Sequence, residues 1–87
     1  MAELIHEHSA RIKGRDGGTY LARIHGQERA DGTWEGWIEF HALKSDGRVV
    51  RTGQESSQPD RRALEYWAGG IQPVYLEGAL GRATPKR

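Results

Sequence analysis

One stretch of strict alternation between two kinds of residue constrains the fold of this chain more than any other feature. Between Thr33 and Leu43, residues of one parity are apolar or small, and most residues of the other parity are polar or charged. A period of two residues is typical of a β-strand with one buried face. The first set comprises Trp34, Gly36, Ile38, Phe40 and Ala42, and the second comprises Glu35, Trp37, Glu39 and His41. The sequence therefore predicts a sheet with a single core face.

Weaker alternation predicts further strands on both sides of this one. We expect them at 4–13, 19–26 and 48–53, with a last strand from Pro73 to about Arg82. The connections between the first four strands are short and rich in glycine and aspartate, so neighbouring strands should pair antiparallel. Gly36 and Gly78 fall inside predicted strands, where glycine indicates a bulge or the close approach of another backbone. The two alternatives for them are that they oppose each other or that they leave room for Trp67 on the sheet.

A single helix is predicted from Pro59 to Ala68. Proline suits the first helical position, because the N–H that it lacks has no partner there. Gly69 and Gly70 follow the helix, and glycine commonly ends helices. The apolar stripe of the helix comprises Ala63, Leu64, Trp67, Ala68 and Ile71. Residues at this spacing share one helical face, so we expect the helix to pack on the sheet.

Together these elements predict an α+β fold: an antiparallel sheet of four or five strands in the order β-β-β-β-α-β, with one helix packed on one face. A small SH3-like barrel fits the same alternation and is the alternative. A chain of 87 residues makes one domain, which we place at 1–83, followed by a flexible basic tail at 84–87. The predicted core comprises Tyr20, Ala22, Ile24, Trp34, Ile38, Phe40, Leu64, Trp67, Val74, Leu76 and Leu80.

One helix can cover only one face of a sheet, so the other face is the candidate functional surface. Its predicted residues mix two aromatic side chains with charges of both signs, a composition that can mark binding and dimer surfaces. Pairing of these charges across strands is the alternative. The candidate interaction face comprises Arg23, His25, Glu35, Trp37, Glu39, His41, Tyr75 and Glu77. We expect a non-catalytic interaction module there, whose partner is a second copy, forming a homodimer, or another protein.

No pattern in the chain points to catalysis, a cofactor or a metal ion. The absence of cysteine excludes disulfides, thiolate nucleophiles and cysteine-based zinc sites. Two histidine pairs, His6 with His8 and His25 with His41, fall on different predicted elements, whereas a metal site needs three or four convergent ligands. No serine-nucleophile motif and no phosphate-binding loop is present. We therefore expect no enzyme activity and no catalytic, cofactor-binding or metal-ligating residues.

The charge balance bears on the remaining classes of partner. A net charge of +1, from 13 Lys/Arg and 12 Asp/Glu, argues against binding of duplex DNA. Single-stranded nucleic acid is the alternative partner, because aromatic residues on a sheet with nearby arginines can stack bases. No apolar run approaches the ~18 residues that a membrane span needs, and residues 1–10 lack the apolar core of a signal peptide. We expect a cytoplasmic protein without a membrane partner.

Four segments between Trp34 and Leu80 carry a resemblance. They are Trp-Glu-Gly-Trp at 34–37, Gln-Pro at 58–59, Tyr-Trp-Ala at 66–68 and Tyr-Leu-Glu-Gly-Ala-Leu at 75–80. Over this part the chain resembles an uncharacterised family of short bacterial proteins. The resemblance implies a bacterial origin, and it implies no activity and no functional residues.

Overall fold

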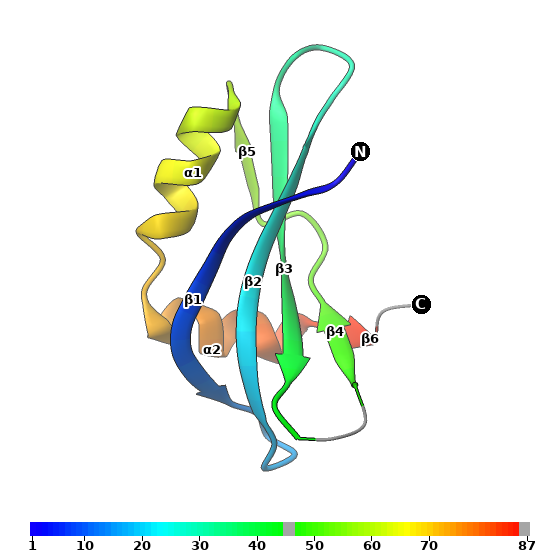
Figure 1. Ribbon diagram of the computed structural model, residues 1–87, viewed down its shortest axis with the longest axis vertical. Helices are drawn as coiled ribbons and strands as arrows, with labels where there is room; N and C mark the ends of the chain where they lie inside the picture. Colours follow the sequence, from blue (N-terminus) through cyan, green and yellow to red (C-terminus); the bar gives the residue numbers. More distant parts are fainter. Residues whose placement is uncertain (45–46, 86–87) are drawn as a thin grey trace.

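The protein folds into an open antiparallel sheet with two helices on one of its faces (Figure 1). The computed structural model describes residues 1–44 and 47–85. The strands are β1 (Glu3–Lys13), β2 (Thr19–Glu28), β3 (Trp34–Ala42), β4 (Val49–Arg51), β5 (Ser56–Gln58) and β6 (Thr84–Pro85), and the helices are α1 (Arg61–Gly69) and α2 (Pro73–Arg82). The sheet order is β1-β2-β3-β4-β6, and β5 also pairs with β3. The predicted α+β class is confirmed, and the sheet does not close into the alternative barrel.

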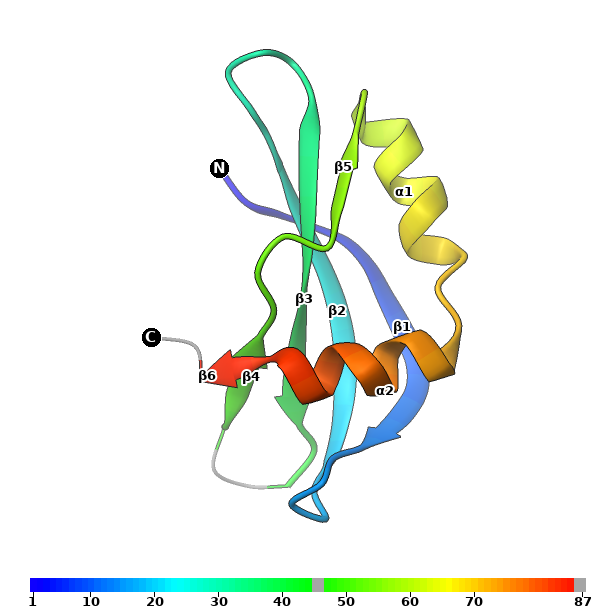
Figure 2. The same cartoon turned by 180° about the vertical axis from the view of Figure 1, so that it is seen from behind.

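Both helices pack on the same side of the sheet. Figure 2 shows α2 running across the strands, with α1 beside β5 at the upper end of the sheet. In Figure 1 the opposite face of the sheet is turned toward the viewer and bears no helix. The core between the sheet and the helices comprises Ile12, Tyr20, Ala22, Ile24, Ile38, Phe40, Val50, Ala68, Leu76 and Ala79. One face of the sheet is thus buried in the core, as the alternation predicts.

Helix α1 begins two residues after the predicted start and ends one residue past the predicted end. Pro59 does not occupy the first helical position, because Asp60 is the N-cap and Pro59 precedes it. The side chain of Asp60 accepts a hydrogen bond from the Ala63 N–H at 2.8 Å, and this N-cap satisfies one of the free N–H groups of the first turn. Leu64 and Ala68, one turn apart, are buried. The Gly70 N–H then bonds back to carbonyl groups of the last turn, which ends the helix.

Leu64 packs onto two glycines that face each other across the sheet. Gly26 on β2 and Gly36 on β3 are opposite each other in the register, and both are buried. A Cβ atom at Gly36 would lie 2.8 Å from Leu64 Cδ1 and 3.4 Å from Trp67 Cζ3, and one at Gly26 would overlap Leu64 Cδ2 more severely. The missing side chains therefore let α1 approach the sheet. Gly36 leaves room for Trp67, as predicted, but the nearest group is the Leu64 side chain rather than another backbone. The alternative that Gly36 and Gly78 oppose each other is wrong, because Gly78 lies in α2 and Gly26 is opposite Gly36.

The segment predicted as the last strand is instead the helix α2, so the prediction of a single helix is wrong. Pro73 lies in its first turn, and Leu76 and Ala79 are buried at the spacing of a helical stripe. Val74, which was predicted in the core, is 73% exposed, and Leu80 is half-buried. Positions four residues apart lie on one face of a strand and also on one face of a helix, so Leu76 and Leu80 fit both periods.

Two short strands lie in segments that were predicted to be irregular. β5 falls within the polar connector before α1 and pairs with the first residues of β3. In β6, Thr84 pairs with Arg51 and Pro85 pairs with Val50. The flexible tail was predicted at 84–87, so the chain stays on the sheet two residues past the predicted boundary of the domain. The rest of that tail, residues 86–87, lies outside the described residues.

The edge strand β1 is irregular. Its register with β2 shifts between Leu4 and His6 and again between Glu7 and Arg11. Such shifts bend a strand and interrupt its ladder of hydrogen bonds. β1 curves strongly in both views, and its first residues cross β2 and β3 on the side without helices (Figures 1 and 2).

The turn between β1 and β2 is held by Asp16. Gly17 adopts a φ of 83°, and the Asp16 carboxylate accepts hydrogen bonds from the Gly18 N–H and from the Tyr20 hydroxyl, each at 2.8 Å. These bonds, the Gly18 bond foremost, lower the pKa of the Asp16 carboxyl, because they favour its charged form. The predicted turn therefore carries a carboxylate that is bound at both oxygens.

Candidate functional site

The sheet face without helices, called the outer face from here on, is assembled by the pairing of β1 to β4. Arg23 and Arg51 lie opposite Glu39 from its two sides, and His25 lies opposite Trp37. Paired residues in an antiparallel sheet point to the same side, so these side chains share one face. The outer face includes Leu4, Glu7, Leu21, Arg23, His25, Gln27, Glu35, Trp37, Glu39, His41, Val49 and Arg51. Six of the eight predicted interaction residues are among them.

Tyr75 and Glu77 do not belong to the outer face, because their segment is the helix α2. The Tyr75 hydroxyl donates a hydrogen bond to Glu55 Oε1 at 2.5 Å, and Arg82 lies 2.7 Å from the same oxygen. Burial first, and the bond to Glu55 second, raise the pKa of Tyr75. Glu77 is exposed. The prediction that Tyr75 and Glu77 share the outer face is therefore wrong, because both lie on α2, on the opposite side of the sheet.

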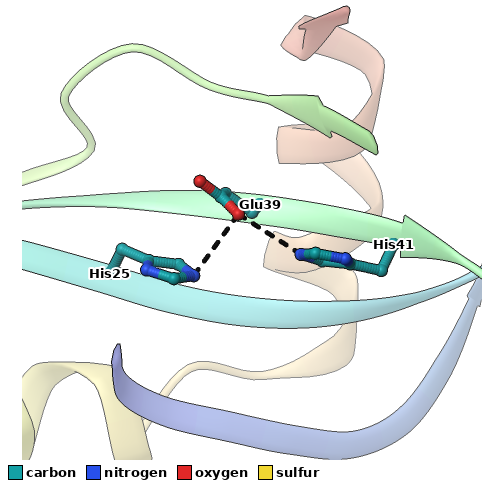
Figure 3. A group of neighbouring side chains, drawn as sticks. All are labelled: His25, Glu39 and His41. Atoms are coloured by element: carbon teal, nitrogen blue, oxygen red, sulfur yellow. Dashed lines mark hydrogen bonds and ion pairs between the residues drawn. The ribbon is translucent and has the colours of Figure 1, made fainter. Parts of the chain in front are cut away.

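Glu39 lies at the centre of the outer face and is only 4% exposed. Two imidazole rings converge on one of its oxygens: Oε1 is 3.2 Å from His41 Nε2 and 3.4 Å from His25 Nε2 (Figure 3). A carboxylate buried in this way needs hydrogen bonds or an opposite charge, since its desolvation costs several kcal/mol. The two histidines supply these partners, and their side chains are 21% and 30% exposed, although the His25 Nε2 atom that faces Glu39 is buried.

Trp37 is buried by its neighbours on the outer face. The Arg51 guanidinium lies 4.8 Å from the centre of its ring, and the His25 ring is stacked at 6.3 Å with an interplanar angle of 14°. Only 6% of the residue is exposed, so the exposed aromatic patch predicted from the sequence is not found at Trp37. Its indole Nε1 is buried and has no hydrogen-bond partner among the residues that the structure describes. A buried N–H group without a hydrogen-bond partner is uncommon in folded proteins.

Other charges of the outer face are paired within the sheet. Arg23 Nε lies 3.0 Å from a carboxylate oxygen of Glu7, and the Gln27 amide donates to Glu35 at 2.9 Å. Exposed pairs of this kind contribute about 1 kcal/mol or less. The alternative of cross-strand pairing is therefore realised at Arg23 and Glu35. The buried group around Glu39 differs, because its carboxylate is withdrawn from water.

The other histidine pair, at the N-terminal end of β1, is built into the fold. The rings of His6 and His8 lie edge to face at 4.7 Å, and His8 Nε2 is 2.8 Å from the carbonyl oxygen of Ala68. Within residues 1–44 and 47–85, the only group of three potential metal ligands with donor atoms within 4.8 Å of one another is His25, Glu39 and His41. The sequence places these three on one face, but their convergence on one oxygen depends on the register of β2 and β3.

A pocket of about 310 Å³ lies elsewhere, between the β1–β2 turn, β4 and α2. Gly14, Gly78 and Gly81 line part of it, together with Arg15 and Glu77. No sequence motif marks this pocket, and its charged lining residues are of both signs.

Comparison with protein-family models, with curated proteins and with solved structures finds no match to this chain. This absence of matches is consistent with the resemblance to an uncharacterised family, which implied no activity. In the described part of the chain, neither helix is long and apolar enough to cross a membrane. The class of the protein is therefore defined by its fold and by the outer face: a small open α+β domain with a buried carboxylate on its helix-free side.

Proposed function

We propose that this protein is a small non-catalytic interaction module that binds a partner protein through the outer face, with a second copy of the chain as the first partner to test. The observation that supports this most is Glu39, a carboxylate that is 4% exposed on a sheet face that no helix covers. Burial of a charged group destabilises a fold unless the group is paired. A buried polar group whose hydrogen bonds are all made holds the surrounding side chains in one rigid arrangement. We interpret the group around Glu39 as a preformed centre for recognition.

An exposed apolar side chain at the margin of the outer face adds to this proposal. Leu4 pairs with His25 in the register and is 50% exposed, so it adds apolar area beside the charged centre. Interfaces combine an apolar core with a polar rim, and Leu4 with the paired charges of Arg23 and Glu7 gives both kinds of surface.

Single-stranded nucleic acid, the alternative partner, has less support. Base stacking needs an accessible aromatic ring, and His25 and Arg51 flank Trp37 from the neighbouring strands. A cytoplasmic location and a bacterial origin remain predictions, which the lack of cysteine and the resemblance favour respectively.

The self-association part of the proposal is tested by sedimentation velocity from about 10 µM to about 1 mM, a range that covers weak to moderate dimers. We expect the sedimentation coefficient to rise with concentration, and Leu4→Asp to suppress the rise. Val74→Asp is the matched control, because Val74 is 73% exposed on α2, on the opposite side of the sheet. A chain that stays monomeric throughout contradicts self-association. A rise abolished by Val74→Asp and kept by Leu4→Asp moves the interface to the helices.

A further inference from the structure

We infer that His25, Glu39 and His41 form a binding site for one divalent transition-metal ion, with zinc as the first candidate. This goes beyond the proposed interaction with a partner and does not depend on it, because all three ligands come from one chain. Two imidazole nitrogens and one carboxylate oxygen are a donor set that zinc accepts, with water in a fourth position.

The distances between the donor atoms fit such an ion. Zinc bonds of about 2.0–2.1 Å at tetrahedral angles place neighbouring donor atoms about 3.3–3.4 Å apart. Glu39 Oε1 lies 3.2 Å from His41 Nε2 and 3.4 Å from His25 Nε2. All donor atoms of the group lie within 4.8 Å of one another, so the two nitrogens need to approach by at most about 1.5 Å. Two of the three distances between donor atoms therefore already match those of a bound zinc ion.

The backbone holds the three ligands on the most regular part of the sheet. Glu39 and His41 are two residues apart on β3 and therefore share a face, and His25 lies on β2. The register of β2 with β3 runs without a shift from Tyr20 opposite Ala42 to Glu28 opposite Trp34. Ligands on paired strands keep their spacing better than ligands on loops, so the site is preorganised. Figure 3 shows the three side chains gathered on one side of the two strands.

The surroundings set the expected affinity. An ion can approach from the side of His41, whose side chain is 30% exposed, whereas the Glu39 carboxylate and the His25 Nε2 atom are buried. Binding therefore requires a small outward movement of the His25 ring. Arg23 and Arg51, which lie opposite Glu39, act against a cation by charge repulsion, although Arg23 is paired with Glu7. We therefore expect micromolar rather than nanomolar binding.

The experiment is isothermal titration of the full chain with zinc sulfate, together with the visible absorption of cobalt(II) as a reporter of tetrahedral coordination. We expect one ion per chain with a dissociation constant of about 1–50 µM. Glu39→Gln and His41→Gln should each weaken binding by about 100-fold or more, since even residues that only orient a ligand contribute 10–100-fold. His6→Gln is the matched control, because it removes a histidine from the other pair and should leave the affinity unchanged.

Two results overturn the inference. One is the absence of heat and of cobalt absorption at millimolar metal, and the other is binding that survives His41→Gln but is lost in His6→Gln. If circular dichroism shows that Glu39→Gln does not fold, the half-exposed positions are tested instead by His25→Gln and His41→Gln. Because metal binding is measured on the isolated chain, its failure leaves the partner proposal standing, and a monomeric chain that binds zinc supports the metal site alone.

Discussion

The packing of Leu64 against Gly26 and Gly36 can be tested by the substitution Gly26→Ala. A Cβ atom at this position would overlap Leu64 Cδ2, and it would lie 3.0 Å from the Glu35 carbonyl oxygen and 3.2 Å from Ile5 Cγ1. Leu64 is fully buried and the Glu35 oxygen belongs to the backbone, so neither group has free space into which to move. The added methyl group must therefore push α1 away from the sheet or strain the strand.

The magnitude follows from two opposing effects. Overpacking of a core costs about 1–3 kcal/mol. Replacement of glycine by alanine stabilises the protein by about 0.4–1 kcal/mol in the opposite direction, because it lowers the conformational entropy of the unfolded chain. We expect Gly26→Ala to lower the free energy of unfolding by about 1–2 kcal/mol, which corresponds to a decrease of roughly 4–16 °C in Tm for a domain of this size.

The assay is urea unfolding followed by tryptophan fluorescence, with a double-mutant cycle. Leu64→Ala alone should cost about 2–5 kcal/mol, because it leaves a cavity. In the double variant the new methyl group occupies part of that cavity, so its loss should be smaller than the sum of the two single losses by about 1 kcal/mol or more. Gly81→Ala is the control: a Cβ there meets nothing within 4 Å, and it should stabilise α2 by about 0.5–1 kcal/mol. Full stability of Gly26→Ala, or strict additivity in the cycle, would refute the role assigned to the glycine pair.

Three further outcomes are expected. Asp60→Ala removes the bond to the Ala63 N–H and should lower the free energy of unfolding by about 1 kcal/mol in urea titrations. Thr52→Val should cost about 1–3 kcal/mol in the same assay, because Thr52 is 2% exposed and its hydroxyl accepts the Ile38 N–H at 3.1 Å. The lowered pKa of Asp16 contributes stability that is complete above the unfolded pKa of 3.8 and is lost as the pH falls through the lower folded value. Asp16→Asn should therefore show a shallower loss of Tm than the parent when the pH is lowered below 3.8, and equal slopes would contradict this account.

The sequence predicted the parts of the fold whose signal is local. The alternation of β3 extends over nine residues with one exception, Trp37, and it is typical of a strand with one core face, so the division into a core face and an outer face was predicted correctly. The burial of Trp37 and Glu39 on the outer face was not predicted. The helix α1 was predicted from its apolar stripe and its glycine end, which agree with each other, whereas its Asp60 cap was not predicted. The signals for residues 73–82 conflict: Gly78 and Gly81 disfavour a helix, Leu76 and Leu80 fit either period, and only Pro73 indicates a helix start.

The sequence predicted which residues share the outer face, but it did not predict that His25, Glu39 and His41 converge at its centre. The parity of β3 placed Glu39 and His41 together, and the parity of β2 added His25. His25 stacks on Trp37, the residue opposite, and also reaches Glu39 diagonally, and both contacts depend on a register between two strands that neither strand encodes alone. The burial of Trp37 depends on Arg51, whose strand β4 is only three residues long and therefore carries almost no pattern.

The two register shifts in β1 have a consequence for how this protein behaves at high concentration. β1 is the longest strand, it lies at the end of the strand order, and most of its residues are exposed or half-exposed. A regular strand in that position would be a template on which other chains could add and grow into fibrils. An incoming straight segment would have to match both offsets of β1 at once, and it would lose hydrogen bonds at each one. The irregular edge thus disfavours the addition of further strands to β1.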